Sequence, residues 1–188
     1  KLNVIPQSAT VKICIPPTLK EKTRDAIIAQ AREISNEIAE FEPDFGVKVT
    51  STAKGEKAVS SASSRLISEV LCEFPDGVEK RREDSVLSSL NMGMAELVEV
   101  LRIGTMLRAN VEAEKQNMTE KIRKVIYNVN GKVICEADYP SWEYKEASPL
   151  RDPMVSVYHK MFGNEPRIES IHAGLECGLF AARIPELD

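Results

Sequence analysis

The sequence predicts an α+β fold in which helices cover one face of an antiparallel sheet. Short segments of alternating apolar and polar residues are interspersed with longer segments in which apolar residues recur every three or four positions. Two of the alternating segments, residues 85–94 and 101–111, follow one another closely and can pair as an antiparallel hairpin. The predicted order of strand, helix, strand, helix, strand, strand, helix, strand is typical of α+β proteins and is related to the split βαβ arrangement.

The first half of the chain contains two predicted strands and two predicted helices. Residues 10–15 and 47–52 alternate as strands, and Pro16–Pro17 ends the first of them. A helix follows, in which Thr18 and Glu21 have the spacing of a capping box. Its apolar stripe consists of Ile27, Ala31, Ile34, Ile38 and Phe41. The second helix is predicted over residues 60–74, with Leu66, Val70, Leu71 and Phe74 at helical spacing.

The hairpin is followed by one more helix and one more strand. The turn of the hairpin is expected near residues 96–99, although no Asn-Gly type signal fixes it there. Residues 118–129 are predicted to form an amphipathic helix that ends at Gly131. Residues 133–137 then alternate as a strand. Met92, Met94 and Met106 are interpreted as side chains that fill gaps in the core of the sheet.

A domain boundary is predicted at residue 139. Residues 139–148 interrupt the periodicity with Pro140, Trp142 and polar side chains, a composition typical of a crossing between domains. We therefore expect one domain over residues 1–138 and a second segment over residues 139–188. In the second segment, Ser148–Pro149 has the preferred pattern of a helix start. The apolar stripe of this helix would be Leu150, Met154, Val157, Tyr158 and Met161, followed by a strand over 167–171 and a short helix that runs toward Arg183.

Composition and charge exclude several classes of function. The net charge is −4, and basic residues are interleaved with acidic ones, so a nucleic-acid partner is not expected. No apolar run reaches the roughly 18 residues that a membrane helix needs, which predicts no membrane association and a cytoplasmic protein. The four cysteines stand far apart without a CxxC pair, which excludes a zinc finger and favours reduced, buried thiols.

Five motifs occur in the order found in Xaa-His dipeptidases, and the chain resembles that family along nearly its whole length. The motifs are Asn3-Val-Ile-Pro6, Ser89-Leu-Asn91, Arg108, Tyr139-Pro-Ser-Trp142 and Ile171-His-Ala-Gly-Leu-Glu-Cys-Gly-Leu-Phe180. These enzymes are zinc exopeptidases of the aminoacylase and carnosinase type. The resemblance implies that residues 1–138 are the latter part of a lid or dimerisation domain. Residues 139–188 would be the return of the chain into an α/β catalytic domain, and both ends are expected to continue into a longer protein.

The resemblance also implies which parts of such an enzyme carry out catalysis. In this family two zinc ions activate a water molecule and a glutamate acts as general base. The positions of the zinc ligands and of the base lie outside this chain, so no catalytic or metal-binding residue is assigned here. The fragment alone is expected to be inactive, while its parent would hydrolyse dipeptides and could form a homodimer through the lid.

Five residues are candidates for substrate binding by this resemblance. Arg108 stands where the family has an arginine that receives the C-terminal carboxylate of the substrate, a task suited to a guanidinium. Its alternative is a solvated strand arginine, and Arg102 has the same parity and would replace it if the register differed. Asn3 matches an asparagine that orients the carboxyl end, with a turn-forming Asn as the alternative. The remaining candidates are His172, Gly174 and Glu176, whose loop lines the substrate pocket in the family.

A second class of function stays open at this point. Sheets of this kind serve many purposes, so the chain can also be a non-catalytic α+β module that dimerises or binds a small ligand. His159, beside Lys160 on a predicted helix, is interpreted as a surface residue.

Overall fold

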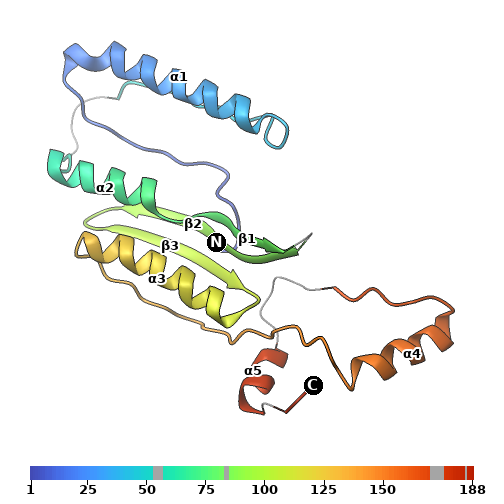
Figure 1. Cartoon of the computed structure of the whole chain (residues 1–188). Helices are drawn as coiled ribbons and strands as arrows, with labels where there is room; N and C mark the ends of the chain where they lie inside the picture. Colours follow the sequence, from blue (N-terminus) through green and yellow to red (C-terminus); the bar gives the residue numbers. More distant parts are fainter. Residues whose placement is uncertain (53–56, 83–84, 170–175, 185) are drawn as a thin grey trace. The chain divides into compact units, whose positions relative to one another are not determined.

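The computed structural model describes residues 1–52, 57–82, 85–169, 176–184 and 186–188 (Figure 1). The chain forms two compact units. One combines residues 1–8 with residues 62–188, and the other consists of residues 9–61. These two units do not test the predicted boundary at residue 139, which stays a prediction.

The larger unit is built on a sheet of three antiparallel strands. These are β1 (Gly77–Arg82), β2 (Ser85–Leu97) and β3 (Leu101–Ala109), in the order β1-β2-β3. The predicted hairpin is confirmed as β2 and β3, and it turns at residues 98–100. Strand β1 was not predicted, because its residues are mostly polar and all six are exposed, which removes the alternation that marks a half-buried strand.

Helices cover one face of this sheet, so the predicted α+β fold is confirmed. Helix α3 (Glu112–Asn128) runs alongside β3 (Figure 1), and α2 (Ser61–Glu73) ends beside Phe74. Leu90 pairs with Leu107 across the hairpin, and both point to the α3 side. The core consists of Phe74, Leu90, Met118 and Ile122, with Met92, Ile103, Leu107, Ile126 and Val133 packed around it.

Helices α2 and α3 were both predicted, although α3 begins earlier than expected. Its first turn contains Glu112 and Glu114, whose charges are favourable at a helix N-terminus. The predicted strand over residues 133–137 is wrong, since these residues form no ladder, even though Val133 packs against the core.

The smaller unit contains a short 3-10 helix, η1 (Pro17–Leu19), and α1 (Lys20–Ile38). Helix α1 confirms the helical periodicity, but none of its residues is buried. The capping box is wrong, because the helix starts after Thr18 and its N-cap Leu19 has no side-chain bond. The predicted strands over 10–15 and 47–52 are also wrong: alternation alone does not make a strand, since each backbone group needs a partner in a neighbouring strand.

The last part of the chain contributes α4 (Arg151–Phe162) and α5 (Glu176–Arg183). Residues 167–169 form no strand, so the described part of the strand predicted over 167–171 is wrong, and its last two residues lie outside the described ranges. The predicted stripe of α4 stays exposed at Leu150, Met154, Val157, Tyr158 and Met161. The four cysteines are exposed thiols rather than the buried ones expected.

Candidate functional site

The register of the hairpin fixes the face of the sheet on which Arg108 lies. Arg108 pairs with Ser89, and the next pairs are Leu90 with Leu107 and Asn91 with Met106. Because successive strand residues point to opposite faces, Arg108 and Asn91 start from the face opposite Leu90 and the core. Arg102 shares this face and is also exposed, as its parity predicted.

The Asn3 motif docks on this same face. Residues 1–4 form a turn in which the Val4 amide donates to the Lys1 carbonyl at 3.3 Å. The Asn91 side-chain amide donates both of its hydrogens to this turn, to Leu2 O at 2.7 Å and to Val4 O at 3.1 Å. Asn3 therefore lies between two carbonyls that are tied to β2, and its own side chain is exposed.

Two glycines in the hairpin make room for the turn. A Cβ on Gly93 would lie 2.6 Å from Leu2 Cα and 2.8 Å from Leu2 O. A Cβ on Gly104 would lie 2.6 Å from Leu2 Cδ2. Gly93 is also the extra residue of a β-bulge, since the register shifts between Met92 and Met94. The bulge and the two missing side chains together form a slot in which Leu2 is seated.

The docked turn lies on the face of the sheet that carries both Arg108 and Arg102. Arg108 is the diagonal neighbour of Asn91, a relation in which side chains start about 7–8 Å apart. Arg102 is two residues along β3 from Gly104, against which the Leu2 side chain packs. An amide and a guanidinium are thus brought to one face, and both can donate hydrogen bonds to a carboxylate.

The other candidate residues lie in the last part of the chain. His172 and Gly174 lie outside the described residues. Glu176 is exposed in the first turn of α5, where the helix dipole favours a carboxylate. Helix α5 packs on the segment after α3 through Gly178, because a Cβ there would lie 2.6 Å from Pro140 O. His159 is exposed, as expected, and its Nδ1 lies 3.2 Å from Glu165.

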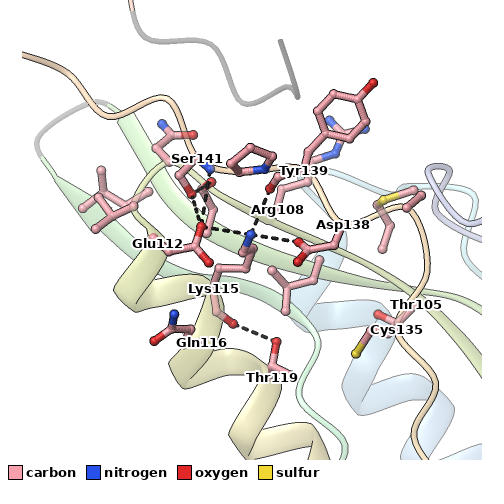
Figure 2. Close-up of a pocket in the computed structure, with 18 of the residues that line it drawn as sticks. Thr105, Arg108, Glu112, Lys115, Gln116, Thr119, Cys135, Asp138, Tyr139 and Ser141 are labelled. Atoms are coloured by element: carbon pink, nitrogen blue, oxygen red, sulfur yellow. Dashed lines mark hydrogen bonds and ion pairs between the residues drawn. The ribbon is translucent and has the colours of Figure 1, made fainter. Parts of the chain in front are cut away.

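A second polar cluster joins α3 to residues 138–143 and is centred on Lys115 (Figure 2). The Lys115 ammonium lies 2.8 Å from Asp138 Oδ1, 2.9 Å from Glu112 Oε2 and 2.9 Å from Tyr139 O. These three acceptors match its three hydrogens. Burial alone lowers the pKa of Lys115, but hydrogen bonds and attraction from Asp138 and Glu112 outweigh it, so the pKa is raised. Lys115 is consequently charged at any physiological pH.

Further bonds hold the same segment against the first turn of α3. Ser141 donates to Glu112 Oε2 from its backbone nitrogen at 3.4 Å and from Oγ at 3.3 Å. The Glu112 amide donates to Glu143 Oε1 at 3.0 Å, which satisfies one of the free donors at the helix start. We call Glu112, Lys115, Asp138, Ser141 and Glu143 the α3 junction.

The start of α4 is capped in a similar way. Asp188 Oδ2 accepts from the Leu150 amide at 2.6 Å and from Ser148 Oγ at 2.8 Å, and these bonds lower the pKa of Asp188. Ser148 Oγ in turn accepts from the Arg151 amide at 2.9 Å. Ser148 thus binds the first residue of α4, but the helix begins at Arg151 with Leu150 as its N-cap, so the predicted start at Ser148–Pro149 is wrong.

An open hollow of about 3120 Å³ runs along β3, α3 and the α3 junction. Ligand pockets are usually about 300–1,000 Å³, so this hollow is too wide to be a fitted site for a small peptide. Both Arg108 and Lys115 line it (Figure 2).

The described residues do not form a metal centre. Within the ranges that the structure covers, no three His, Cys, Asp or Glu side chains are grouped closely enough to hold a metal ion. Among the described helices, none has the length and apolar character required to span a bilayer.

Sequence reasoning missed the roles of Asn91 and Lys115. Asn91 was noted only as part of a motif, and its contact with Leu2 spans 89 residues of sequence. Gly93 and Gly104 could have indicated the docked turn, because glycine inside a strand often marks a bulge or the close approach of another backbone.

The chain is similar to part of two known dipeptidases. It is 26% identical over 190 residues to the cytosol non-specific dipeptidase of Escherichia coli, an alignment that covers 99% of this chain and 39% of that protein. Its structure matches the crystal structure of aminoacylhistidine dipeptidase from Vibrio alginolyticus with a TM-score of 0.85 and 22% identity, covering 93% of this chain and 36% of that one. No family model matches. The chain spans about two fifths of the length of these relatives, and the comparisons confirm that it resembles a dipeptidase of this kind and has the fold of the corresponding part.

Proposed function

We propose that this chain is the lid and return segment of a cytoplasmic, metal-dependent dipeptidase that hydrolyses short peptides, with Xaa-His dipeptides as preferred substrates. Its contribution is to hold the C-terminal carboxylate of the substrate. The observation that supports this proposal is that the turn containing Asn3 is bonded to the same face of the β2–β3 hairpin from which Arg108 starts. The two zinc ions implied by the resemblance, with their ligands and the general base, are proposed to come from outside this chain.

The chemistry of the two side chains suits this role. A guanidinium offers a planar fork of donors that matches both oxygens of a carboxylate, and its charge selects a free C-terminus. The Asn3 amide can donate to the same group and accept from a peptide N–H. Both residues are exposed on the side of the sheet away from the core, where a substrate could reach them. His172, Gly174 and Glu176 are proposed to line the same substrate site from the return segment.

A non-catalytic dimerisation module is the second candidate. The observation that favours it is the exposed stripe of α4, in which Met154 and Met161 are 61% and 69% exposed. Apolar stripes of this kind are typical of surfaces that another chain covers. The two functions are compatible, since a lid can also dimerise.

The test uses the full-length gene product and compares Arg108→Ala with Arg102→Ala. Both substitutions remove an exposed arginine from the same face of the same strand, so Arg102→Ala is a matched control. Losing one partner of a desolvated charge pair costs about 2–5 kcal/mol. We expect Arg108→Ala to lower kcat/KM correspondingly while zinc content and thermal unfolding stay unchanged, and Arg102→Ala to have little effect.

Two further measurements sharpen the test. Arg108→Lys should rescue only in part, because an ammonium keeps the charge but loses the fork. The defect should shrink for substrates with an amidated C-terminus, which offer no carboxylate. If Arg108→Ala is kinetically identical to wild type, or if the gene product cleaves no dipeptide, the proposed role is wrong. The 188-residue chain alone is expected to be inactive.

A further inference from the structure

We infer that Asn91 is a positioning residue, which presents Asn3 to the substrate by holding the turn at residues 1–4 in the glycine slot of the hairpin. This inference rests on the proposed function for its catalytic consequence. Its structural basis is independent of that function, because it depends only on the contacts of Leu2 and Val4.

The hydrogen bonds show why Asn91 in particular can do this. Its Nδ2 is the donor in both contacts, and the two acceptors are the carbonyls on either side of Asn3. One amide group therefore holds the peptide unit directly before Asn3 and the peptide unit that follows Val4. The backbone of Asn91 is itself fixed, because its carbonyl accepts from Thr105 Oγ1 at 2.9 Å across the hairpin.

The neighbouring positions complete the support. The Met92 amide donates to Asp76 Oδ1 at 2.7 Å, which holds the strand directly before the bulge. At the bulge, the Leu2 backbone lies so close to Gly93 that a Cβ on residue 93 would clash with it. Asn91 therefore binds the turn by hydrogen bonds, and Gly93 leaves the space in which the turn packs.

The same arrangement couples Asn3 to Arg108. Strand β2 positions both residues. Arg108 is paired with Ser89 of this strand, and the turn that contains Asn3 is bonded to Asn91, which lies two residues after Ser89 on the same face. The spacing between the two carboxylate-binding groups is therefore set by one stretch of a single strand. A displacement of about 1 Å at a substrate-positioning group can cost on the order of 100-fold in rate.

The test is a double-mutant cycle in the full-length gene product, measured with an Xaa-His dipeptide. Asn91→Ala should lower kcat/KM by roughly 10- to 100-fold. Asn3→Ala should cause a similar loss, and the double variant should be no worse than Asn3→Ala alone, because Asn91 acts through Asn3. Multiplicative losses in the double variant would overturn the inference.

Conservative variants separate positioning from simple space filling. Asn91→Asp has the shape of Asn but only acceptors, so it should be as damaging as Asn91→Ala. Rescue by Asp would show that Asn91 only fills space. Asn110→Ala is the matched control, since its side-chain amide also donates to a backbone carbonyl of the sheet, Val86 O at 3.4 Å, away from the turn. It should leave the kinetics unchanged.

A second pair of variants keeps the inference testable if Asn91 variants fold poorly. Gly93→Ala places a methyl group against the Leu2 backbone, whereas Gly104→Ala meets side-chain atoms of Leu2 and Met94 and no backbone. Gly93→Ala should reproduce the kinetic loss and Gly104→Ala should cause a smaller one. Wild-type activity of the Gly93→Ala variant would contradict the inference.

A structural readout distinguishes failure of this inference from failure of the proposed function. Hydrogen exchange measured by mass spectrometry should rise over residues 1–5 in Asn91→Ala and Gly93→Ala, but not in Asn110→Ala. If exchange rises while Asn3→Ala and Arg108→Ala are fully active, Asn91 holds the turn and the proposed function is wrong. If Asn3→Ala is impaired but Asn91→Ala changes neither exchange nor kinetics, the positioning role is wrong.

Discussion

The β2–β3 hairpin with α3 and the unit of residues 9–61 are both rich in apolar periodicity, yet among the described residues only the first has a core. In the hairpin region, Leu90 is 3% exposed and Met118 1%. Helix α1 has a comparable stripe without a single buried residue. The contrast shows that periodicity predicts the type of an element, whereas burial depends on whether another element covers the stripe.

The strongest test of this contrast is to remove equivalent apolar groups from both regions. Met118→Ala should lower the free energy of unfolding of the 188-residue chain by about 2–5 kcal/mol, because it opens a cavity among Phe74, Leu90 and Ile122. Ile27→Ala in α1 should change it by less than about 0.5–1 kcal/mol. Urea denaturation followed by circular dichroism gives both values, and similar losses would break the comparison.

The hairpin was predictable because each of its strands alternates and the two are adjacent in sequence. Segments 10–15 and 47–52 alternate equally well and form no strand, since alternation does not supply a partner. Strand β1 forms without alternation because β2 offers it a hydrogen-bonding edge. In the candidate site, the sequence predicted that Arg102 and Arg108 share a face, because they are an even number of residues apart on one strand. The docking of the Asn3 turn depends on a bulge and on contacts between residues 87–89 positions apart, which no local sequence pattern predicts.

An intermediate effect is expected at the α3 junction, which links the cored region to the last part of the chain. Lys115→Met should lower the free energy of unfolding by about 1–2 kcal/mol, since it leaves Glu112, Asp138 and a carbonyl without their common donor. The control is Arg123→Met, which breaks an exposed pair with Glu120 on the same helix and should have a clearly smaller effect on the free energy of unfolding. Equal values for the two variants would show that the junction is no more than a surface ion pair.

The smallest expected effect has the opposite sign and concerns Ser88. Its hydroxyl is fully buried, and Oγ has no hydrogen-bond partner among the described residues. A buried polar atom without a partner keeps its desolvation cost, so Ser88→Ala should leave stability unchanged or raise it by up to about 1 kcal/mol. A clear loss of stability in the same denaturation experiment would reveal a bond to the hydroxyl.

The raised pKa of Lys115 also governs its reactivity as an amine. Acylating reagents attack the neutral form, and at Lys115 all three hydrogens are bonded and deprotonation is disfavoured. Lys115 should therefore be modified more slowly than the other lysines for as long as residues 138–141 stay docked on α3. Its rate of acetylation, read by mass spectrometry, reports how often the α3 junction opens.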